Sequence, residues 1–349
     1  MVSWRVSVLD RASRAAIRTG LRAPTPLLVT LTGGRVRRDG LLLDPQLAVA
    51  LAMARRAGVP SLETMDVPAA RAHVARVFGL FDVEPQPMES VTDTAAPGPT
   101  GPVPIRIYRP PHTGDGLVVY IHGGGGVVGS LEGADALARL IAAQVRCQVA
   151  SVDYRLAPEH PHPAAVDDAE AAWRHLAERA PALGVSPARM VLAGDSMGGL
   201  MCAHVERRVR PGPRPALMVL IYPATDLTMS QPSHTTFSDG FVLTAPLIRW
   251  FRDHYCPSEH RAASPLFFDD LEGAAPTLII TAGFDPLRDE GRLYADRLRR
   301  AGAAVEYRCH DDLVHGFVQM TGAIDAARAA TGRLVRDIRA ALYPDEVVA

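Results

Sequence analysis

The sequence predicts an α/β fold with a mostly parallel sheet, and the order of its apolar segments supports that prediction. Short runs rich in Val, Ile and Leu recur at residues 117–122, 149–154, 190–196, 217–222, 277–282 and 305–309. Helix-like stretches separate these runs, as expected when helices cover both faces of a parallel sheet. Two further β-like runs, at 89–94 and 105–109, flank Pro97-Gly98 and predict a hairpin where the sheet begins.

Before the hairpin, the pattern predicts helices and no strands. Asp44-Pro45 and the pair Asp66 and Pro68 are helix-start signals, each followed by apolar residues at helical spacing. The first forty residues carry eight arginines against two acidic residues. This charge pattern fits a membrane-surface or targeting helix, or a solvated helix face, which we favour. We expect residues 1–85 to form a helical cap segment.

A second interruption lies within the α/β pattern. Between Thr225 and Ala262 no strand-like run occurs, and Thr244-Ala245-Pro246 starts a helix that carries Trp250. We expect residues 225–262 to form a second cap segment, which leaves 86–224 and 263–349 as the two parts of the α/β core.

The composition is that of a globular protein, with 48% hydrophobic and 21% charged residues in a chain of 349. A net charge of −1 gives no reason to expect nucleic acid as a partner.

The four cysteines are scattered and form no CxxC pair, so neither a metal site nor disulfides are expected; they are Cys147, Cys202, Cys256 and Cys309. No run approaches the ~20 apolar residues of a membrane span, and the N-terminus lacks a secretory signal. We therefore expect a cytoplasmic protein without stable membrane insertion, and leave a homodimer open.

The residues Gly194-Asp195-Ser196-Met197-Gly198 match G-x-S-x-G between a strand-like run and a helix-like stretch. A sharp strand-to-helix turn exposes the serine hydroxyl, and the helix start offers backbone N–H groups to an oxyanion. The pattern alone is weak, because a glycine-rich chain of this size matches it by chance about once in ten.

A second motif strengthens the first. His122-Gly123-Gly124-Gly125 follows the strand-like run 117–122, where acyl transfer needs a loop that approaches the substrate oxygen with bare backbone amides. Such a motif arises by chance in about one chain in a hundred.

The same loop also allows a different interpretation. Gly124-x-Gly126-x-x-Gly129 fits a dinucleotide fingerprint, and Asp153 lies at roughly the ~20-residue offset of a ribose-binding acid. Against a nucleotide-dependent oxidoreductase, Gly133 still follows the motif and helical periodicity resumes only around Ala134, whereas a dinucleotide fold starts its helix inside the motif.

Hydrolysis by a serine requires a base and an acid that orients it. His315 lies after the last strand-like run and before the final helix, where the base of the order Ser, acid, His belongs. Asp285 follows the apolar run 277–282 and should lie at the carboxyl edge of the sheet. Asp226, after the preceding strand, is its rival. Asp289 and Glu290 are expected to begin a helix.

Taken together, these motifs, with Ser151 to Glu159, Asp285 to Asp289 and His315-Gly316-Phe317, resemble the bacterial hormone-sensitive-lipase-like carboxylesterases of the α/β-hydrolase fold. The resemblance covers about residue 44 to the C-terminus. It implies an eight-stranded sheet with a helical cap, and an activity on short- to medium-chain carboxylic esters without metal or organic cofactor.

Carried over by position, the resemblance makes Ser196 the nucleophile, His315 the base and Asp285 the acid. It assigns the oxyanion hole to the amides of Gly124, Gly125 and Met197. Supporting roles go to His122, Gly123 and Asp195, and structural roles to Tyr154, Arg155 and Glu159. A non-catalytic ligand-binding homologue is a further alternative, although a receptor has no need of the base.

Three positions depart from the family pattern: Gly126, Met197 and Leu200. Gly126 stands where a bulky residue is common, so we expect extra room at the substrate pocket, or room filled by a cap residue such as Phe241 or Trp250.

Overall fold

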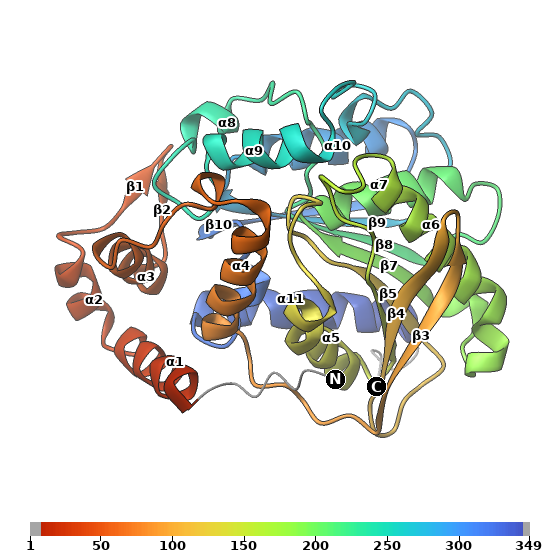
Figure 1. The fold of residues 1–349 in the computed structure, drawn as a ribbon, viewed down its shortest axis with the longest axis horizontal. Coiled ribbons are helices and arrows are strands. Elements are labelled where there is room, and N and C mark those ends of the chain that lie inside the picture. The colour runs from red at the N-terminus through yellow and green to blue at the C-terminus, as the bar shows by residue number, and fades with distance from the viewer. Residues whose placement is uncertain (1–7, 345–349) are drawn as a thin grey trace.

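The computed structural model describes residues 8–344, in which an eight-stranded sheet forms the centre of the molecule (Figure 1). Its strands are β3 (Ser90–Gly98), β4 (Gly101–Arg109), β5 (Leu117–Ile121), β6 (Gln148–Val152), β7 (Met190–Asp195), β8 (Leu217–Ile221), β9 (Thr277–Phe284) and β10 (Val305–Val314). The spatial order is β10-β9-β8-β7-β5-β6-β4-β3. Strands β5 to β10 pair in parallel, whereas β4 runs antiparallel to both β3 and β6. The predicted mostly parallel α/β fold is confirmed.

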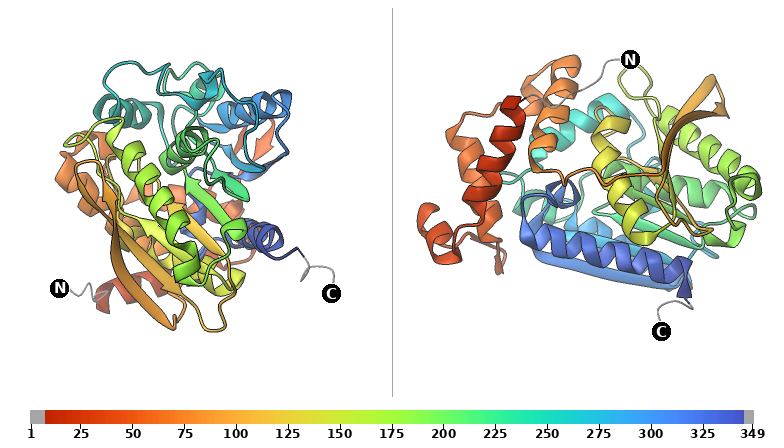
Figure 2. Two further views of the ribbon diagram at one scale, coloured as in Figure 1. Left: turned by 90° about the vertical axis from the view of Figure 1, so that its right-hand side faces the viewer. Right: turned by 90° about the horizontal axis from the view of Figure 1, so that it is seen from below.

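Helices cover both faces of this sheet. The α-helices of the described residues are α1 (Val8–Leu21), α2 (Thr25–Leu31), α3 (Pro45–Arg56), α4 (Val67–Phe81), α5 (Leu131–Val145), α6 (Ala164–Arg179), α7 (Met197–Arg208), α8 (Ser233–Thr236), α9 (Ala245–Tyr255), α10 (Arg288–Arg300) and α11 (Asp325–Leu342). Helices α6, α7 and α10 pack on one face, and α5 and α11 on the other, where α11 runs along the underside of the molecule (Figure 2).

Because side chains alternate along a strand, each buried strand contributes to two cores. In β5, Val119 and Ile121 join the core beneath α6 and α7, while Val118 and Tyr120 join the core beneath α5 and α11. All five residues of β5 are buried, as the continuous apolar run predicts.

The predicted helix starts are confirmed by their capping bonds. The Asp44 carboxylate accepts the backbone N–H groups of Gln46 and Leu47 at the start of α3, and Asp66 accepts that of Ala69 in α4. The Thr244 hydroxyl oxygen likewise accepts the N–H of Leu247 at the start of α9. These side chains satisfy amide groups that a first helical turn leaves unpaired.

Three local predictions were wrong. Residues 37–38 and 41–42 pair as the two-residue strands β1 (Arg37–Arg38) and β2 (Leu41–Leu42), so the N-terminal part is not free of strands. The hairpin turns at residues 99–100, because Gly98 still pairs with Gly101. Helix α5 begins at Leu131, where the Ser130 hydroxyl caps the N–H of Gly133, so Gly133 lies inside the helix.

The N-terminal helices and the segment between β8 and β9 lie beside each other. Arg38 donates to the carbonyl of Thr236 and to the Asp239 carboxylate, and its guanidinium lies over the ring of Phe241. Residues 1–7, which include Arg5, lie outside the described part of the chain. From Val8 to residue 344, no helix combines the length and the apolarity that crossing a bilayer requires.

Candidate active site

Ser196 sits on a strained turn between β7 and α7. Its φ of 54° and ψ of −118° lie outside the regions that a side chain prefers. The turn is tight because its two glycines touch other backbone: a Cβ on Gly194 would come within 2.5 Å of the Gly198 carbonyl oxygen, and one on Gly198 would overlap Ile121. Close backbone packing therefore requires glycine at both positions of the G-x-S-x-G pattern. The Ser196 side chain between them points away from this packed backbone.

The Ser196 hydroxyl is joined to an acid through one histidine. His315 Nε2 lies 2.9 Å from Ser196 Oγ, and His315 Nδ1 lies 2.7 Å from Asp285 Oδ2. Asp285 is fully buried, and its other carboxylate oxygen accepts the N–H of Leu287. The carboxylate thus holds Nδ1 as the donor and leaves Nε2 to accept the serine proton, which is the arrangement that general-base catalysis requires.

Asp226, the alternative acid, accepts hydrogen bonds from residues of its own loop. Its two oxygens accept hydrogen bonds from the backbone and hydroxyl groups of Thr228 and Ser230 at 2.5 to 3.0 Å. Burial tends to raise the pKa of Asp226, but these hydrogen bonds outweigh it and hold the pKa below its ordinary value. The side chain that contacts His315 is that of Asp285.

The His122-Gly123-Gly124-Gly125 loop is held by aromatic and carboxylate partners. The His122 ring stacks on Tyr154 with centroids 4.4 Å apart, and the Tyr154 hydroxyl donates to the His122 carbonyl. Burial lowers the pKa of His122, which favours a neutral ring. Gly124 and Gly125 have φ values of 113° and 64°, which glycine adopts without strain.

The amides proposed for an oxyanion are free to act as donors. Among the described residues, none accepts a hydrogen bond from the backbone N–H of Gly124 or Gly125. Met197 is the first residue of α7, where a helix has no internal acceptor for its N–H.

Asp195 connects this loop to the serine turn. Its Oδ1 accepts from the Tyr120 hydroxyl at 2.6 Å and from the Gly123 N–H at 2.8 Å, and its Oδ2 accepts from Gln319 at 3.1 Å. A Cβ on Gly123 would come within 2.6 Å of that carboxylate, so only glycine permits the contact. Because Asp195 precedes Ser196 directly, one buried carboxylate fixes the positions of both segments.

Helix α9 lies directly on the glycine loop, so of the two alternatives expected at Gly126, extra room is wrong and filling by a residue of the 225–262 segment is confirmed. A Cβ on Gly125 would overlap the ring of Phe251, and one on Gly126 would overlap the buried ring of Tyr255. Tyr255, rather than Phe241 or Trp250, therefore fills the space beside Gly126.

The other two predicted pocket residues lie in different surroundings. Phe241 packs on Phe237 and Phe284 in the core beneath α5 and α11, with ring centroids 5.9 and 5.1 Å away. Trp250 is half-buried beside Phe251 and His254. Of the two, Trp250 is the one that borders the residues over the glycine loop.

Comparison with known proteins agrees with this geometry. A family model for the alpha/beta hydrolase fold matches residues 118–319, more than half of the chain. The chain is 43% identical over 338 residues to the carboxylic ester hydrolase LipN of Mycobacterium tuberculosis, covering 91% of this chain and 89% of LipN. This chain belongs to the hormone-sensitive-lipase-like carboxylesterase family of the α/β-hydrolase fold.

Two other ester-cleaving proteins are similar to this hydrolase over most of their length. The ethyl acetate hydrolase of Pseudomonas putida is 37% identical over 72% of this chain and 82% of its own. The solved structure of a hyperthermophilic esterase from Pyrobaculum calidifontis superposes with a TM-score of 0.78 at 35% identity, covering 85% of this chain and 98% of that one. The dinucleotide interpretation of Gly124, Gly126 and Gly129 is not favoured by these matches.

The hydrolase core contains a second buried histidine and acid, behind Asp285. His234 Nε2 lies 2.9 Å from Glu290 Oε2, and Glu290 Oε1 accepts the N–H groups of Thr225 and Asp226. Burial alone would lower the pKa of His234, but the Glu290 carboxylate holds it above its ordinary value. Asp289 and Glu290 do lie in the first turn of α10, as predicted.

Next to this pair, Ser233 ties α8 to the loop of the acid. Its hydroxyl donates to the Pro286 carbonyl, and its N–H donates to the Asp289 carboxylate. The loop that presents Asp285 is therefore fastened from the segment between β8 and β9.

Sequence reasoning missed Arg71, which fastens α4 to the loop. Arg71 donates to the Val127 and Ala157 carbonyls and forms a bidentate ion pair with Glu159. It also missed Tyr222, whose ring lies 4.6 Å from that of His315 and whose hydroxyl donates to Gln319. No motif marks Arg71 or Gln319; for Tyr222, its place directly after an apolar strand is a weak signal.

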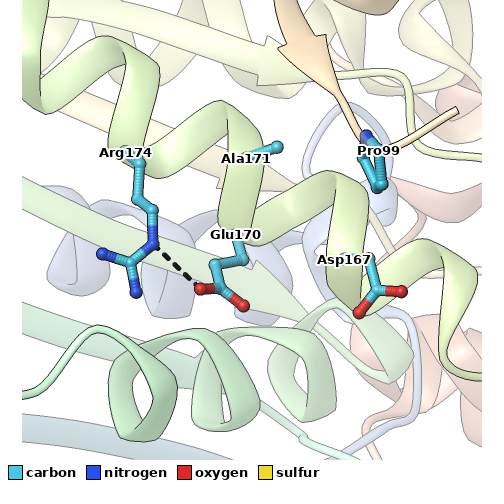
Figure 3. Close-up of a pocket in the computed structure, with 5 residues that line it drawn as sticks. All are labelled: Pro99, Asp167, Glu170, Ala171 and Arg174. Carbon is cyan, nitrogen blue, oxygen red and sulfur yellow. Dashed lines mark hydrogen bonds and ion pairs between the residues drawn. The ribbon is translucent and has the colours of Figure 1, made fainter. Parts of the chain in front are cut away.

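A hollow elsewhere on the hydrolase contains none of the predicted site residues. It lies at α6 and the β3–β4 turn, encloses ≈ 310 Å³, and is lined by Pro99, Asp167, Glu170, Ala171 and Arg174 (Figure 3). Arg174 Nε donates to Glu170 at 2.9 Å, and Arg208 from α7 bonds both Asp167 and Glu170. Its charged groups join α6 to α7.

Proposed function

We propose that this hydrolase is a serine carboxylesterase in which Ser196 is the nucleophile, His315 the base and Asp285 the orienting acid. The observation that carries the proposal is the continuous contact from Asp285 through His315 to Ser196, with distances of 2.7 and 2.9 Å. The names of two relatives, carboxylic ester hydrolase LipN and ethyl acetate hydrolase, support the same reaction.

The geometry suggests a two-step reaction. Ser196 Oγ attacks the ester carbonyl carbon while His315 Nε2 takes the hydroxyl proton, and the resulting oxyanion is held by backbone N–H groups. Collapse of this intermediate breaks the bond to the alkoxy oxygen, which leaves with the proton from His315, and an acyl-serine forms. Water, deprotonated by His315, then attacks the acyl carbon and releases the acid, and Ser196 regains its proton.

The amides of Gly124, Gly125 and Met197 are proposed as the oxyanion donors. The free N–H groups of the two glycines support this role, as does the helix start at Met197, where the dipole of α7 favours negative charge. Asp195, Gly123 and His122 are proposed to hold these donors in place rather than to contact substrate.

The N-terminal segment up to about residue 85 and residues 225–262 are proposed as the cap. Support comes from Phe251 and Tyr255 of α9, which cover the glycine loop, and from Arg71 of α4, which bonds its far end. With aromatic rings so close to Gly125 and Gly126, we infer that acyl groups of short to medium length fit best. Ethyl acetate hydrolase, a relative, is named for a short ester.

A cytoplasmic location and a homodimer are further parts of this proposal. All four cysteines are unpaired, which suits a reducing compartment. Cell fractionation and light scattering of the purified chain are the measurements that test them.

A fluorophosphonate probe tests the central assignment, because it forms a covalent bond with an activated serine. Wild-type protein should be labelled at Ser196, whereas Ser196→Ala should fold, resist labelling and hydrolyse a p-nitrophenyl ester ~10⁴ to 10⁶ times more slowly. An unlabelled, inactive wild type would favour a non-catalytic homologue. Binding of NAD(P) without labelling would favour the oxidoreductase alternative.

A further inference from the structure

Exposed apolar side chains gather on one part of the N-terminal segment. Of the five large hydrophobic residues exposed among the described residues, four lie between residues 27 and 59: Leu27, Leu31, Met53 and Val59. The fifth, Val91, lies on the edge strand β3. Single exposed apolar residues are common on protein surfaces, but such clustering marks an interaction site.

The fold explains why these side chains stay in solvent. Leu27 and Leu31 are four residues apart on α2 and share a face, whereas Leu28 points into the core and is 2% exposed. Helix α2 packs against α3, which carries Met53. Helices α1 and α2 form the outer edge of the molecule at the left of Figure 1 and again in the right-hand view of Figure 2.

The same part of the chain is strongly basic. From residue 11 to residue 38 the sequence contains seven arginines and no acidic residue. Two of them have a structural function: Arg18 binds the Glu84 carboxylate and the Asp82 carbonyl, and Arg14 donates to that carbonyl, which fastens α1 to the end of α4.

Other arginines of this part remain available. Arg22, Arg35, Arg37 and Arg56 are exposed, and none is within ion-pair distance of a carboxylate in the part of the chain that the structure describes. Arg22 precedes α2, Arg35 and Arg37 follow it, and Arg56 ends α3. We call these four arginines, together with Leu27, Leu31, Met53 and Val59, the α2–α3 surface.

Exposed apolar side chains and unpaired arginines on the same two helices and their flanking residues fit an anionic bilayer. Apolar side chains enter the boundary between headgroups and acyl chains, while arginines bind the phosphates. A second copy of the chain fits less well, because a two-fold interface would bring the same arginines together. We propose that the α2–α3 surface docks this protein on membranes that contain anionic phospholipids.

Docking of this kind is peripheral and needs no spanning helix. Arg38 joins the N-terminal segment to the second proposed cap segment through Thr236 and Asp239. Docking would therefore bring both cap segments close to a lipid phase that dissolves apolar esters. The docking proposal does not depend on the reaction at Ser196, because lipid binding is measured without turnover.

Sedimentation with vesicles tests the proposal on the full chain. Binding should be strong to vesicles of phosphatidylglycerol mixed with phosphatidylcholine, weak to phosphatidylcholine alone, and reduced by high salt. Leu27→Asp combined with Leu31→Asp should lower the partition coefficient at least tenfold, and so should Arg35→Ser combined with Arg37→Ser.

Two substitutions serve as matched controls. Val91→Asp removes the exposed large hydrophobic side chain that lies outside the surface among the described residues, and Arg300→Ser removes an exposed arginine of α10. Both should leave vesicle binding and hydrolysis of a soluble ester unchanged. The proposal is overturned if the wild type prefers neither vesicle, if the controls lose binding equally, or if the leucine variants turn a dimer into a monomer.

Discussion

Asp195 offers a sharp test of how the serine turn and the glycine loop are held together. The side chain is buried, and Oδ1 accepts from Tyr120 and Gly123 while Oδ2 accepts from Gln319. Asp195→Ala removes every acceptor, whereas Asp195→Asn keeps Oδ1 and replaces only Oδ2 with a donor. The two variants therefore separate the shape of the hydrogen-bond network from its charge.

The expected magnitudes follow from the groups left unpaired. In Asp195→Ala, the Tyr120 hydroxyl and the Gly123 N–H lose their acceptor inside the core, at about 1 to 3 kcal/mol each, so the free energy of unfolding should fall by about 2 to 6 kcal/mol. In Asp195→Asn both bonds remain but lose their charged acceptor. The loss should then be about 1 to 2 kcal/mol, since the Gln319 amide can rotate to present its oxygen to the introduced asparagine amide at the expense of its hydrogen bond from the Tyr222 hydroxyl.

The two variants should also differ in catalysis. Without the bond to Gly123, the oxyanion amides shift, and a misplacement of about 1 Å costs on the order of 100-fold in rate. We expect kcat/KM for a p-nitrophenyl ester to fall about 100-fold in Asp195→Ala, mainly through kcat, and less than about tenfold in Asp195→Asn. Urea unfolding and steady-state kinetics measure both effects. Equal losses in the two variants would refute the positioning argument and indicate that the charge itself matters.

Three other predictions follow from the same structure. Asp285→Asn should lower kcat by ~10⁴, while Asp226→Asn should change it little, because only Asp285 contacts the base; the opposite ranking in steady-state kinetics would contradict the assignment. Gly126→Ala should lower the free energy of unfolding in urea by about 2 to 4 kcal/mol, because alanine is strained at a φ of 71° and its Cβ would overlap the Tyr255 ring. Gly240→Ala is the control: its φ is 82° but its Cβ would meet open space, so the loss should be only about 1 kcal/mol. Burial raises the pKa of Asp82 to about 7, so the unfolded chain loses this proton at a lower pH than the folded protein does. The free energy of unfolding should therefore fall as pH rises from about 4 to about 7. Asp82→Asn should reduce this decline by at most ~4 kcal/mol, measured by urea unfolding across that pH range.

Much of the fold and of the candidate site could be predicted from the sequence because it is written in local patterns. Apolar runs such as Leu117–Ile121 form buried parallel strands wherever both faces are covered. The glycines around Ser196 are required by backbone contact alone, so the motif is visible without coordinates. The helix starts at Asp44 and Thr244 depend on a side chain and amides two or three residues away.

Contacts between distant segments were decided only by the tertiary structure. The choice between Asp285 and Asp226 depends on which loop reaches His315. The side chains that hold the site come from distant positions, as do Asp195 and Gln319, which are 124 residues apart. Whether the space at Gly126 is empty or filled could not be predicted, because a missing side chain says nothing about what the rest of the chain places beside it; here Tyr255 fills the space. A sequence pattern reflects the conformation and burial of its own segment. Which other segment packs against it is decided by the close packing of the whole folded chain.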